Sequence, residues 1–586
     1  MYLKKVKSKD ITYLKFVETI WDKTTKKRSQ RTILNLGRLD TLMENGLPFI
    51  LKKLAETVNQ ELEKKKIEER KEYPNLKDIN TISQKGRSNY GHIIYRKLWD
   101  NYQFSAYLER LKKRTKITFD LAEQIYLMTI NQLLNPSSKL KLWKNNSNYF
   151  ATEQVQLQNL YRSLDVLAEN KENIENYIFQ KNKNLFNQKI DIVFYDVTTF
   201  YFESQKSDEL KDFGFDKDNK INNVHIVMGL LIDRTGKPIG YELFKGNTYE
   251  GHTLLKTIKK LQKRFSIDTV VIVADKGLNS KINLKEIREA GYHYIVSGRL
   301  KSMKTVTKQA VFNLSDYITS DKNSISFLKE NDEKLKFMYK ILDYENEVRY
   351  KENPEDKRFK KIILQEKLIC TYSSKRANKD KKDRERMLEK AQVIIDKNEK
   401  SKLNSFKGHK KYIAKEHAKG SESEDFKLIL NQKKVKEDEK YDGFYVIQSS
   451  KLDLSAKEVI ENYHYLYKIE ESFRVMKSTM QVRPINHWTP KRIEGHFVMS
   501  FIAFLLEREL ELRLIQNKKT NAPEQIKEAV NSLEFSVLNI ENQKYYIRNK
   551  HKKLASEIMA VLKIKQPENL LNKQQVETYM KEHYKT

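Results

Sequence analysis

The sequence predicts an α/β protein whose mixed β-sheet is flanked by helices, interrupted by a β-rich insertion and bordered by helical regions at both ends. Three observations support this fold class. Between residues 190 and 300, short apolar runs alternate with amphipathic segments. A highly charged stretch of different composition, 301–441, follows, and the α/β pattern resumes at Gly443. Helical periodicity dominates residues 91–180 and the region after Gln516.

Length and composition limit what the chain can be. Its 586 residues are too many for one compact core, so three or more domains are expected. Lysine and arginine number 112 against 79 acidic residues, and the net charge of +33 predicts attraction to a polyanion, with nucleic acid the leading candidate. The longest apolar run, 497–506, has about half the length that spans a bilayer and predicts a buried helix. Cys370 is the only cysteine, which excludes internal disulfides and fits a reducing cytoplasm.

The N-terminal region predicts a β-hairpin followed by a helix. Residues 12–20 and 31–36 have strand character, and Gly37 closes the second strand. Helical periodicity then runs from about residue 40 to residue 73. An ordinary surface hairpin would have the same pattern as one that touches phosphates through Arg28, Arg31 and Arg38.

Residues 91–180 predict a helical domain that docks on DNA. Asp120 is expected to cap a helix that runs to Leu134 and stops before Pro136. Short helix pairs of this kind can dock on DNA, here through Lys139, Lys141, Lys144 and Arg162. Any small basic helical domain would share these features.

Residues 190–300 predict the central sheet. Strands are expected at 190–195, 223–233, 238–244, 269–274 and 293–297, and helices at 253–265 and 283–290. The fourth strand is apolar throughout, as in a strand that is buried on both faces. Three antiparallel strands, a helix, a parallel strand, a helix and another strand form the element order of an RNase H-like fold.

A β-rich domain is expected to interrupt this core. Residues 301–441 contain three strand-like stretches around a charged helix at 376–399. The strand-like stretches are 335–342, 361–372 and 426–430. The predicted domains are a hairpin with a helix (1–80), a helical DNA-binding domain (81–185), the first part of the RNase H-like core (186–300), the insertion (301–441), the second part of the core (442–515) and a helical C-terminal region (516–586).

The stretch 461–480 is the most informative part of the sequence. On a helical wheel one apolar stripe comprises Leu466, Ile469, Phe473, Met476 and Met480. Polar residues gather immediately beside the stripe, namely Tyr463, Glu470, Arg474 and Lys477. A salt-bridged rim on an amphipathic helix would explain these residues equally well if the stretch stood alone.

Two aspartates favour a catalytic explanation of that rim. Asp196 and Asp275 each follow an apolar strand, where α/β sheets usually place their sites. Asp191 should point to the opposite sheet face and is the poorer candidate. If the helix packs on the sheet by its stripe, Glu470 completes a group of three carboxylates, whereas Glu471 points about 100° away.

Three neighbouring carboxylates predict a metal site. They repel one another and would take up protons unless a cation lies among them. Oxygen ligands of this kind select Mg²⁺ or Mn²⁺. Two such ions, about 4 Å apart, would activate a water or a 3′-hydroxyl and stabilise the leaving oxygen in phosphodiester cleavage and strand transfer. Cations that would face the phosphates are Lys276, Arg474 and Lys477.

Several motifs resemble those of DDE insertion-sequence transposases. They are YDVTTF (195–200), VADKG (273–277) and Tyr463-x2-Leu466-x3-Glu470-x6-Lys477. The last is similar to the Y-x2-R-x3-E-x6-K signature that names one branch of the family. The segments IEESFRVMKSTMQVRPINHW (469–488), LGRL at the end of the hairpin and NPSSKL (135–140) also resemble that branch. Leu466 replaces the signature's arginine, and Arg474 could supply the missing phosphate contact.

The resemblance implies the roles of these residues. Asp196, Asp275 and Glu470 would bind two Mg²⁺ ions, for which Mn²⁺ would substitute. Tyr463 and Lys477 would contact DNA near the cleaved end. Further DNA contacts are expected from Lys276, Arg474, Arg483, His487 and Trp488.

The resemblance also implies a reaction and its partners. The protein would bind the terminal inverted repeats of its element and target DNA, work as a homodimer, and perform cut-and-paste transposition through a DNA hairpin. Hairpin formation needs an aromatic residue that holds a flipped base, and the candidates are Tyr441, Phe444, Tyr445 and Trp488. The expected place is the bacterial cytoplasm, at the nucleoid when bound to DNA, with no membrane partner. Two alternatives remain: an inactive DNA-binding protein derived from a transposase, acting as a repressor, and an RNase H-like nuclease without strand transfer.

Overall fold

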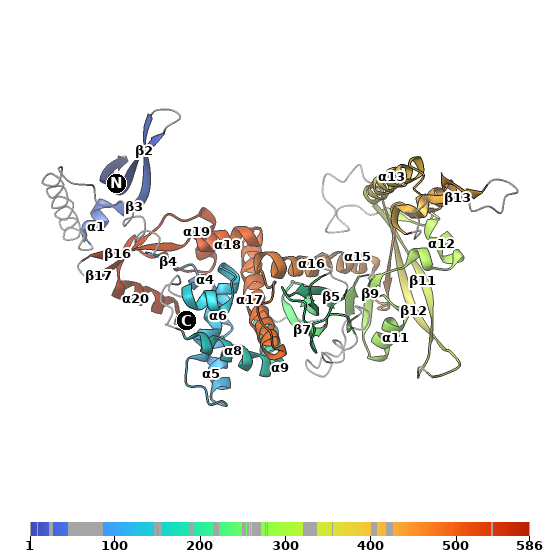
Figure 1. Cartoon of the computed structure of the whole chain (residues 1–586), viewed down its shortest axis with the longest axis horizontal. Helices are drawn as coiled ribbons and strands as arrows, with labels where there is room; N and C mark the ends of the chain where they lie inside the picture. The colour runs from blue at the N-terminus through green and yellow to red at the C-terminus, as the bar shows by residue number, and fades with distance from the viewer. Residues whose placement is uncertain are drawn as a thin grey trace.

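The chain folds into an elongated molecule with its N-terminal strands at one end and the inserted elements at the other (Figure 1). The computed structural model describes residues 2–8, 10–22, 27–44, 86–145, 149, 155–186, 192–214, 222–248, 253–254, 257, 260, 271–275, 277, 279–319, 337–353, 355–399, 407–417, 426–540 and 543–584. The central sheet lies between the helical region and the insertion (Figure 1).

The central sheet has the predicted order. In the described part of the chain it contains nine strands, in the spatial order β10 (Ile318–Thr319), β11 (Phe337–Tyr350), β12 (Lys360–Ser373), β15 (Phe444–Ser449), β9 (His293–Ser297), β8 (Val271–Ala274), β5 (Ile192–Tyr201), β6 (His225–Asp233) and β7 (Pro238–Lys245). β5, β6 and β7 pair antiparallel, whereas β5 with β8 and β8 with β9 pair parallel. The RNase H-like fold class is therefore confirmed. Helix α11 (Lys281–Glu289) connects β8 to β9.

The inserted region extends this sheet, which differs from the expected separate β-rich domain. β12 pairs antiparallel with β15, so the β11–β12 hairpin continues the core sheet. The inner half of β12 is apolar and buried, and pairing with β15 covers it. A separate small core forms around α13 (Ser374–Asp396) and the elements that follow it, which are a 3₁₀ turn (Gly408–Tyr412), β13 (Ile413–His417), β14 (Phe426–Leu430) and α14 (Gln432–Glu439).

A helical region covers the opposite end of the core. It comprises α4 (Ile93–Asn101), α5 (Phe104–Lys112), α6 (Leu121–Leu134), α7 (Lys139–Asn145), α8 (Leu157–Glu169) and α9 (Lys171–Phe186). The Asp120 carboxylate caps α6 by accepting from the Glu123 backbone N–H at 2.8 Å, as predicted. The apolar run 497–506 lies within the buried helix α17 (Pro490–Gln516), which packs against α6 and α8. Among the described residues, no helix is both long and apolar enough to cross a bilayer.

Both ends of the chain carry strands. The predicted hairpin is present as β2 (Ile11–Asp22) and β3 (Lys27–Arg38), preceded by β1 (Tyr2–Ser8) and followed by α1 (Leu39–Glu44). Most of the helix expected at 40–73 lies outside the described residues.

The C-terminal region contains the expected helices and, in addition, strands that were not predicted. Between α18 (Pro523–Asn531), α19 (Lys553–Val561) and α20 (Lys573–Tyr584) lie the strands β16 (Glu534–Ile540), β17 (Gln543–Arg548) and β18 (Leu570–Asn572). They form a sheet with β4 (Arg87–Asn89) in the order β18-β17-β16-β4. Because β4 comes from far away in the sequence, local pattern could not reveal this pairing.

Gly495→Ala is expected to destabilise the helical region. A Cβ at this position of α17 would lie 2.0 Å from the Leu164 carbonyl oxygen of α8. The two helix backbones cannot move apart without a cost in free energy. We expect a loss of about 1–3 kcal/mol in the free energy of unfolding. Urea unfolding followed by circular dichroism measures it, with Gln516→Ala at the exposed end of the same helix as the control. Equal stability of the two variants would refute the close approach.

Candidate active site

The two core aspartates lie at the same level on neighbouring strands of the central sheet. Asp196 belongs to β5, and Asp275 directly follows β8. In the parallel ladder Tyr195 pairs with Ala274, so the next residues on each strand are Asp196 and Asp275. Neighbouring strands are about 4.8 Å apart. Two carboxylates from distant parts of the sequence therefore share one level of the sheet.

Both carboxylates face the side of the sheet that the helix of Glu470 covers. Tyr195 and Ala274 contribute to the smaller hydrophobic core, while Phe194 and Val273 belong to the larger one on the opposite face. Strand alternation then directs Asp196 and Asp275 to the side of the larger core. Asp196 is half-buried and Asp275 is exposed. Asp191, the poorer candidate, lies outside the described residues.

The stretch 461–480 is helical but not one continuous α-helix. It contains the end of α15 (Ala456–His464), a break at 465–466, α16 (Tyr467–Arg474) and a π-helical turn (Val475–Thr479). The apolar stripe is confirmed, since all five of its residues are buried. Leu466 belongs to it and is 7% exposed, so leucine at the signature's arginine position serves packing. π-helical turns are frequent at functional sites.

Glu470 and Glu471 have different surroundings. The Glu471 carboxylate forms ion pairs with Arg508 and Arg474, each at 3.6 Å. Glu470 is exposed in the first turn of α16, and no hydrogen bond or ion pair joins it to the part of the chain that is described. α16 packs on β5 and β6. Glu471 therefore holds the helix, and Glu470 remains available for a ligand.

A chain of hydroxyl groups reaches Asp275. The Tyr463 hydroxyl donates to Asp275 Oδ1 at 3.5 Å and lies 2.5 Å from the Tyr445 hydroxyl, which donates to Ser297 Oγ at 2.6 Å. Burial, followed by the neighbouring Tyr445, raises the pKa of Tyr463, so the phenol stays protonated. Ser297 and the position of Tyr445 were not predicted, because β15 approaches β9 only after the long insertion.

A basic rim borders the end of β5. Lys477 Nζ lies 5.8 Å from the centre of the Phe200 ring, and the Arg483 guanidinium lies 5.4 Å from that of Tyr201. Trp488 is 67% exposed, and Lys211 Nζ donates to its carbonyl oxygen at 3.2 Å. Lys276 lies outside the described residues. Two predicted cations therefore lie beside the C-terminal end of β5, and one predicted aromatic is exposed.

His487, a predicted DNA contact, is buried. Its ring is 6% exposed and packs edge-on against Tyr161. Burial, helped by the positive charges of Lys139 and Arg492, lowers the pKa of His487 to about 3. A buried neutral imidazole offers neither a surface nor a charge to a phosphate in this structure, and the DNA contact of His487 stays a prediction. Lys139, predicted to dock on DNA, is also buried, and burial lowers its pKa to about 7.

The donors at this site fit a hard divalent cation, but they are not gathered into a complete ligand set. Carboxylate oxygens from Asp196, Asp275 and Glu470 are the type that Mg²⁺ and Mn²⁺ prefer. Among the described residues no three His, Cys, Asp or Glu side chains lie close enough to hold a metal ion together. The sheet thus sets the two aspartates at one level, and Glu470 lies on the helix that packs on β5 and β6.

Comparison with known families identifies the core. Residues 187–506, more than half of the chain, match the family model of the transposase DDE domain. The chain belongs to this family. Residues 3–71 match the N-terminal domain of IS1634 family transposases. The protein is thus a DNA transposase, an enzyme of the class that cuts DNA and joins it by transesterification. DDE transposases depend on divalent metal ions.

The transposase is also similar to solved structures of other transposases. A piggyBac transposase synaptic complex with hairpin DNA is 10% identical, with a TM-score of 0.31 over 76% of this chain and 80% of that one. A Mos1 transposase paired-end complex with the left transposon end is 12% identical, with a TM-score of 0.14 over 32% and 65%. No curated protein sequence matches the chain. The transposase prediction is confirmed for the family, and membership of the Y-x2-R-x3-E-x6-K branch stays a prediction.

Proposed function

We propose that this transposase binds the terminal inverted repeats of its own insertion sequence and cuts and joins them with Asp196, Asp275 and Glu470. The observation that carries this proposal is the register of β5 and β8, which sets the two aspartates level on the face that α16 covers. The uncommitted carboxylate of Glu470 on that helix supplies the third group. DNA cleavage and strand transfer both need such a group of acids.

The three acids act together in the proposal. Asp196, Asp275 and Glu470 would hold Mg²⁺, for which Mn²⁺ would substitute. The ions would supply activation of the attacking oxygen and stabilisation of the departing one. Tyr463 orients the Asp275 carboxylate through its hydroxyl, in addition to the DNA contact expected from the sequence.

The basic rim would hold the DNA end. Lys477 and Arg483 lie beside β5 and would neutralise phosphates on either side of the cut. Of the four aromatic candidates for holding a flipped base, Tyr441 and Phe444 pack in a core of the insertion and Tyr445 bonds Tyr463. Trp488 is exposed, so we assign it the flipped base of a hairpin intermediate.

A cleavage assay on labelled terminal-repeat DNA tests the proposal. The repeats can be read from the DNA that flanks the gene. With Mg²⁺ present, we expect cleavage at the element end, a hairpin product and joining to target DNA. Cleavage without joining would assign the chain to nucleases, and binding without cleavage would make it an inactive DNA-binding protein. Two ends must be joined, so a dimer should form on paired-end DNA, as measured by light scattering.

Arg474→Ala is expected to slow end cleavage. Arg474 is exposed one turn after Glu470 and forms an ion pair with Glu471 at 3.6 Å, and Glu471 keeps Arg508 as a partner when Arg474 is removed. Loss of one charged phosphate contact should lower the cleavage rate about tenfold. Arg386→Ala, an exposed arginine on α13 with a similar ion pair, is the control. Unchanged cleavage by the Arg474 variant would remove this residue from the site.

DNA binding should weaken steeply as salt is added. The net charge of +33 attracts phosphates, and every phosphate contact releases counterions. If six or more phosphates are contacted, affinity should fall by about a thousandfold or more between 50 and 200 mM salt. Fluorescence anisotropy with labelled terminal-repeat DNA measures the slope. A flat response would show that the charge surplus does not contact DNA.

A further inference from the structure

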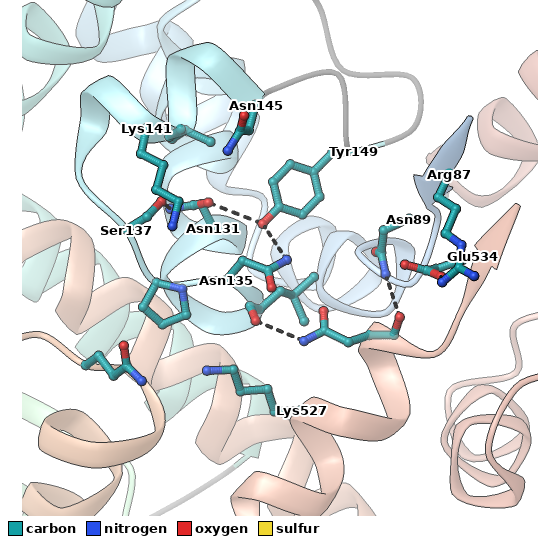
Figure 2. Close-up of a pocket in the computed structure, with 15 residues that line it drawn as sticks. Arg87, Asn89, Asn131, Asn135, Ser137, Lys141, Asn145, Tyr149, Lys527 and Glu534 are labelled. Carbon is teal, nitrogen blue, oxygen red and sulfur yellow. Dashed lines mark hydrogen bonds and ion pairs between the residues drawn. The ribbon is translucent and has the colours of Figure 1, made fainter. Parts of the chain in front are cut away.

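A polar pocket lies outside the proposed active site. Its volume is about 650 Å³, and its walls come from α6, α7 and the segment between them, from α18, and from β4 and β16 (Figure 2). Gln481, two residues after the π-helical turn that ends the Glu470 helix, closes one side. The segment between α6 and α7 holds most of NPSSKL (135–140), which the proposed chemistry does not use.

Side-chain amides dominate the lining of this pocket. They belong to Asn89, Asn131, Asn135, Asn145, Gln481 and Asn531. Asn89 is 7% exposed, and its Oδ1 is buried without a hydrogen-bond partner among the described residues. Asn531 Oδ1 is likewise buried without a hydrogen-bond partner among the described residues, while Asn531 Nδ2 donates to the Leu134 carbonyl at 2.9 Å. Buried acceptors without donors cost free energy, so a ligand that donates hydrogen bonds would be favoured here.

The charges at the pocket favour an anion. Lys141 is exposed at the rim, and its ammonium has no ion pair within the described residues. Arg87 lies 3.6 Å from Glu534, the only acid in the lining. Lys527 Nζ donates to the Thr479 carbonyl at 2.8 Å. Three cations therefore face one carboxylate, and Lys141 is the cation best placed to meet a phosphate.

The pocket is tied to the end of the Glu470 helix. Lys527, in its lining, donates to the Thr479 carbonyl, and Gln132 Nε2 donates to that of Met480 at 2.6 Å. These are carbonyl groups that the end of a helix leaves without intrahelical partners. A ligand in the pocket would therefore lie next to the C-terminal end of the segment that carries Glu470 and Lys477.

We propose that this pocket binds one unpaired nucleotide of the DNA that the transposase handles. Amides present donors and acceptors together and suit the edge of a base, and Lys141 suits its phosphate. The Tyr149 ring forms part of the wall, with its hydroxyl donating to Asn131 Oδ1 at 3.3 Å (Figure 2). The volume falls in the range of small-molecule sites. This inference rests on the proposed function, which supplies the DNA.

Photocrosslinking and binding with the full chain test this site. The probe is a short terminal-repeat duplex with one unpaired 5-iodouracil nucleotide, compared with the fully paired duplex. We expect about tenfold tighter binding of the unpaired probe, and crosslinks in peptides that contain residues 131–149 or 527–534. Lys141→Ala combined with Asn145→Ala should abolish both the preference and these crosslinks. Both side chains are exposed, so folding should be retained, which circular dichroism checks.

Two controls decide between the pocket and general attraction to DNA. Lys144→Ala removes the same charge from the same helix outside the lining and should keep the preference. Trp488→Ala should keep the crosslinks at 131–149 or 527–534. Crosslinks found only near Trp488, or a preference that survives the double substitution, would overturn the proposal.

The test of the nucleotide site can fail independently of the test of the proposed function. Pocket crosslinks in a protein that does not cleave would uphold the nucleotide site and refute the catalytic proposal. Cleavage and joining with crosslinks only elsewhere would refute the nucleotide site alone.

Discussion

Asp196→Ala is expected to abolish both end cleavage and strand transfer while DNA binding stays intact. Asp196 is half-buried on β5 at the level of Asp275, where its carboxylate would hold the metal ions for both reactions. Losing a ligand that contributes several kcal/mol of transition-state stabilisation should lower both rates about a thousandfold or more. Gel assays with labelled terminal-repeat DNA measure the rates, and anisotropy measures binding.

A matched control separates the loss of a catalytic carboxylate from the loss of any negative charge. Asp383→Ala removes an exposed aspartate on α13, far from β5 in the sequence, and should leave both rates unchanged. If Asp196→Ala cleaved within tenfold of the wild-type rate, Asp196 could not be a metal ligand. If binding fell in parallel with cleavage, the variant would have lost its fold or its DNA surface.

Glu470→Gln is expected to lower the cleavage rate about a hundredfold or more, whereas Glu471→Gln should retain most of the cleavage activity. The change keeps the size of the side chain and removes the charge that would hold a metal. Glu471 already pairs with Arg508 and Arg474, so its loss should affect stability more than chemistry. The two adjacent substitutions serve as controls for each other in one assay.

The reverse result would change the assignment. If Glu471→Gln lost most of its cleavage activity while Glu470→Gln cleaved normally, the third catalytic acid would be Glu471. A thermal unfolding scan of both variants shows which loss is structural. We expect the lower midpoint for Glu471→Gln, because the substitution leaves the buried Arg508 with one carboxylate fewer.

The core of the fold could be predicted from the sequence because its signals are local. Each strand from β5 to β9 is a short apolar run, and the stripe of α16 follows the helical period. Asp275 could be found because it ends such a run, whereas Asp196 follows the apolar start of β5, which continues to Tyr201. The choice of Glu470 over Glu471 rested on the helical wheel. The ion pairs that Glu471 forms with Arg474 and Arg508 also favour Glu470.

What escaped prediction depends on distant pairing. β12 joins β15 across the insertion, and β4 joins β16 across most of the chain. The contact between Tyr463 and Tyr445 depends on the same distant approach. The burial of His487 against Tyr161 also depends on distant packing that its own segment does not reveal.

Mapping the metal with iron tests the central claim most directly. Fe²⁺ that replaces Mg²⁺ at a carboxylate site produces hydroxyl radicals with ascorbate and peroxide, and these cut the polypeptide close to the ion. With terminal-repeat DNA bound, we expect cuts near residues 196, 275 and 470 that disappear with excess Mg²⁺ and in Asp196→Ala. Cuts confined to other segments, or unchanged in that variant, would contradict the assignment of the three acids.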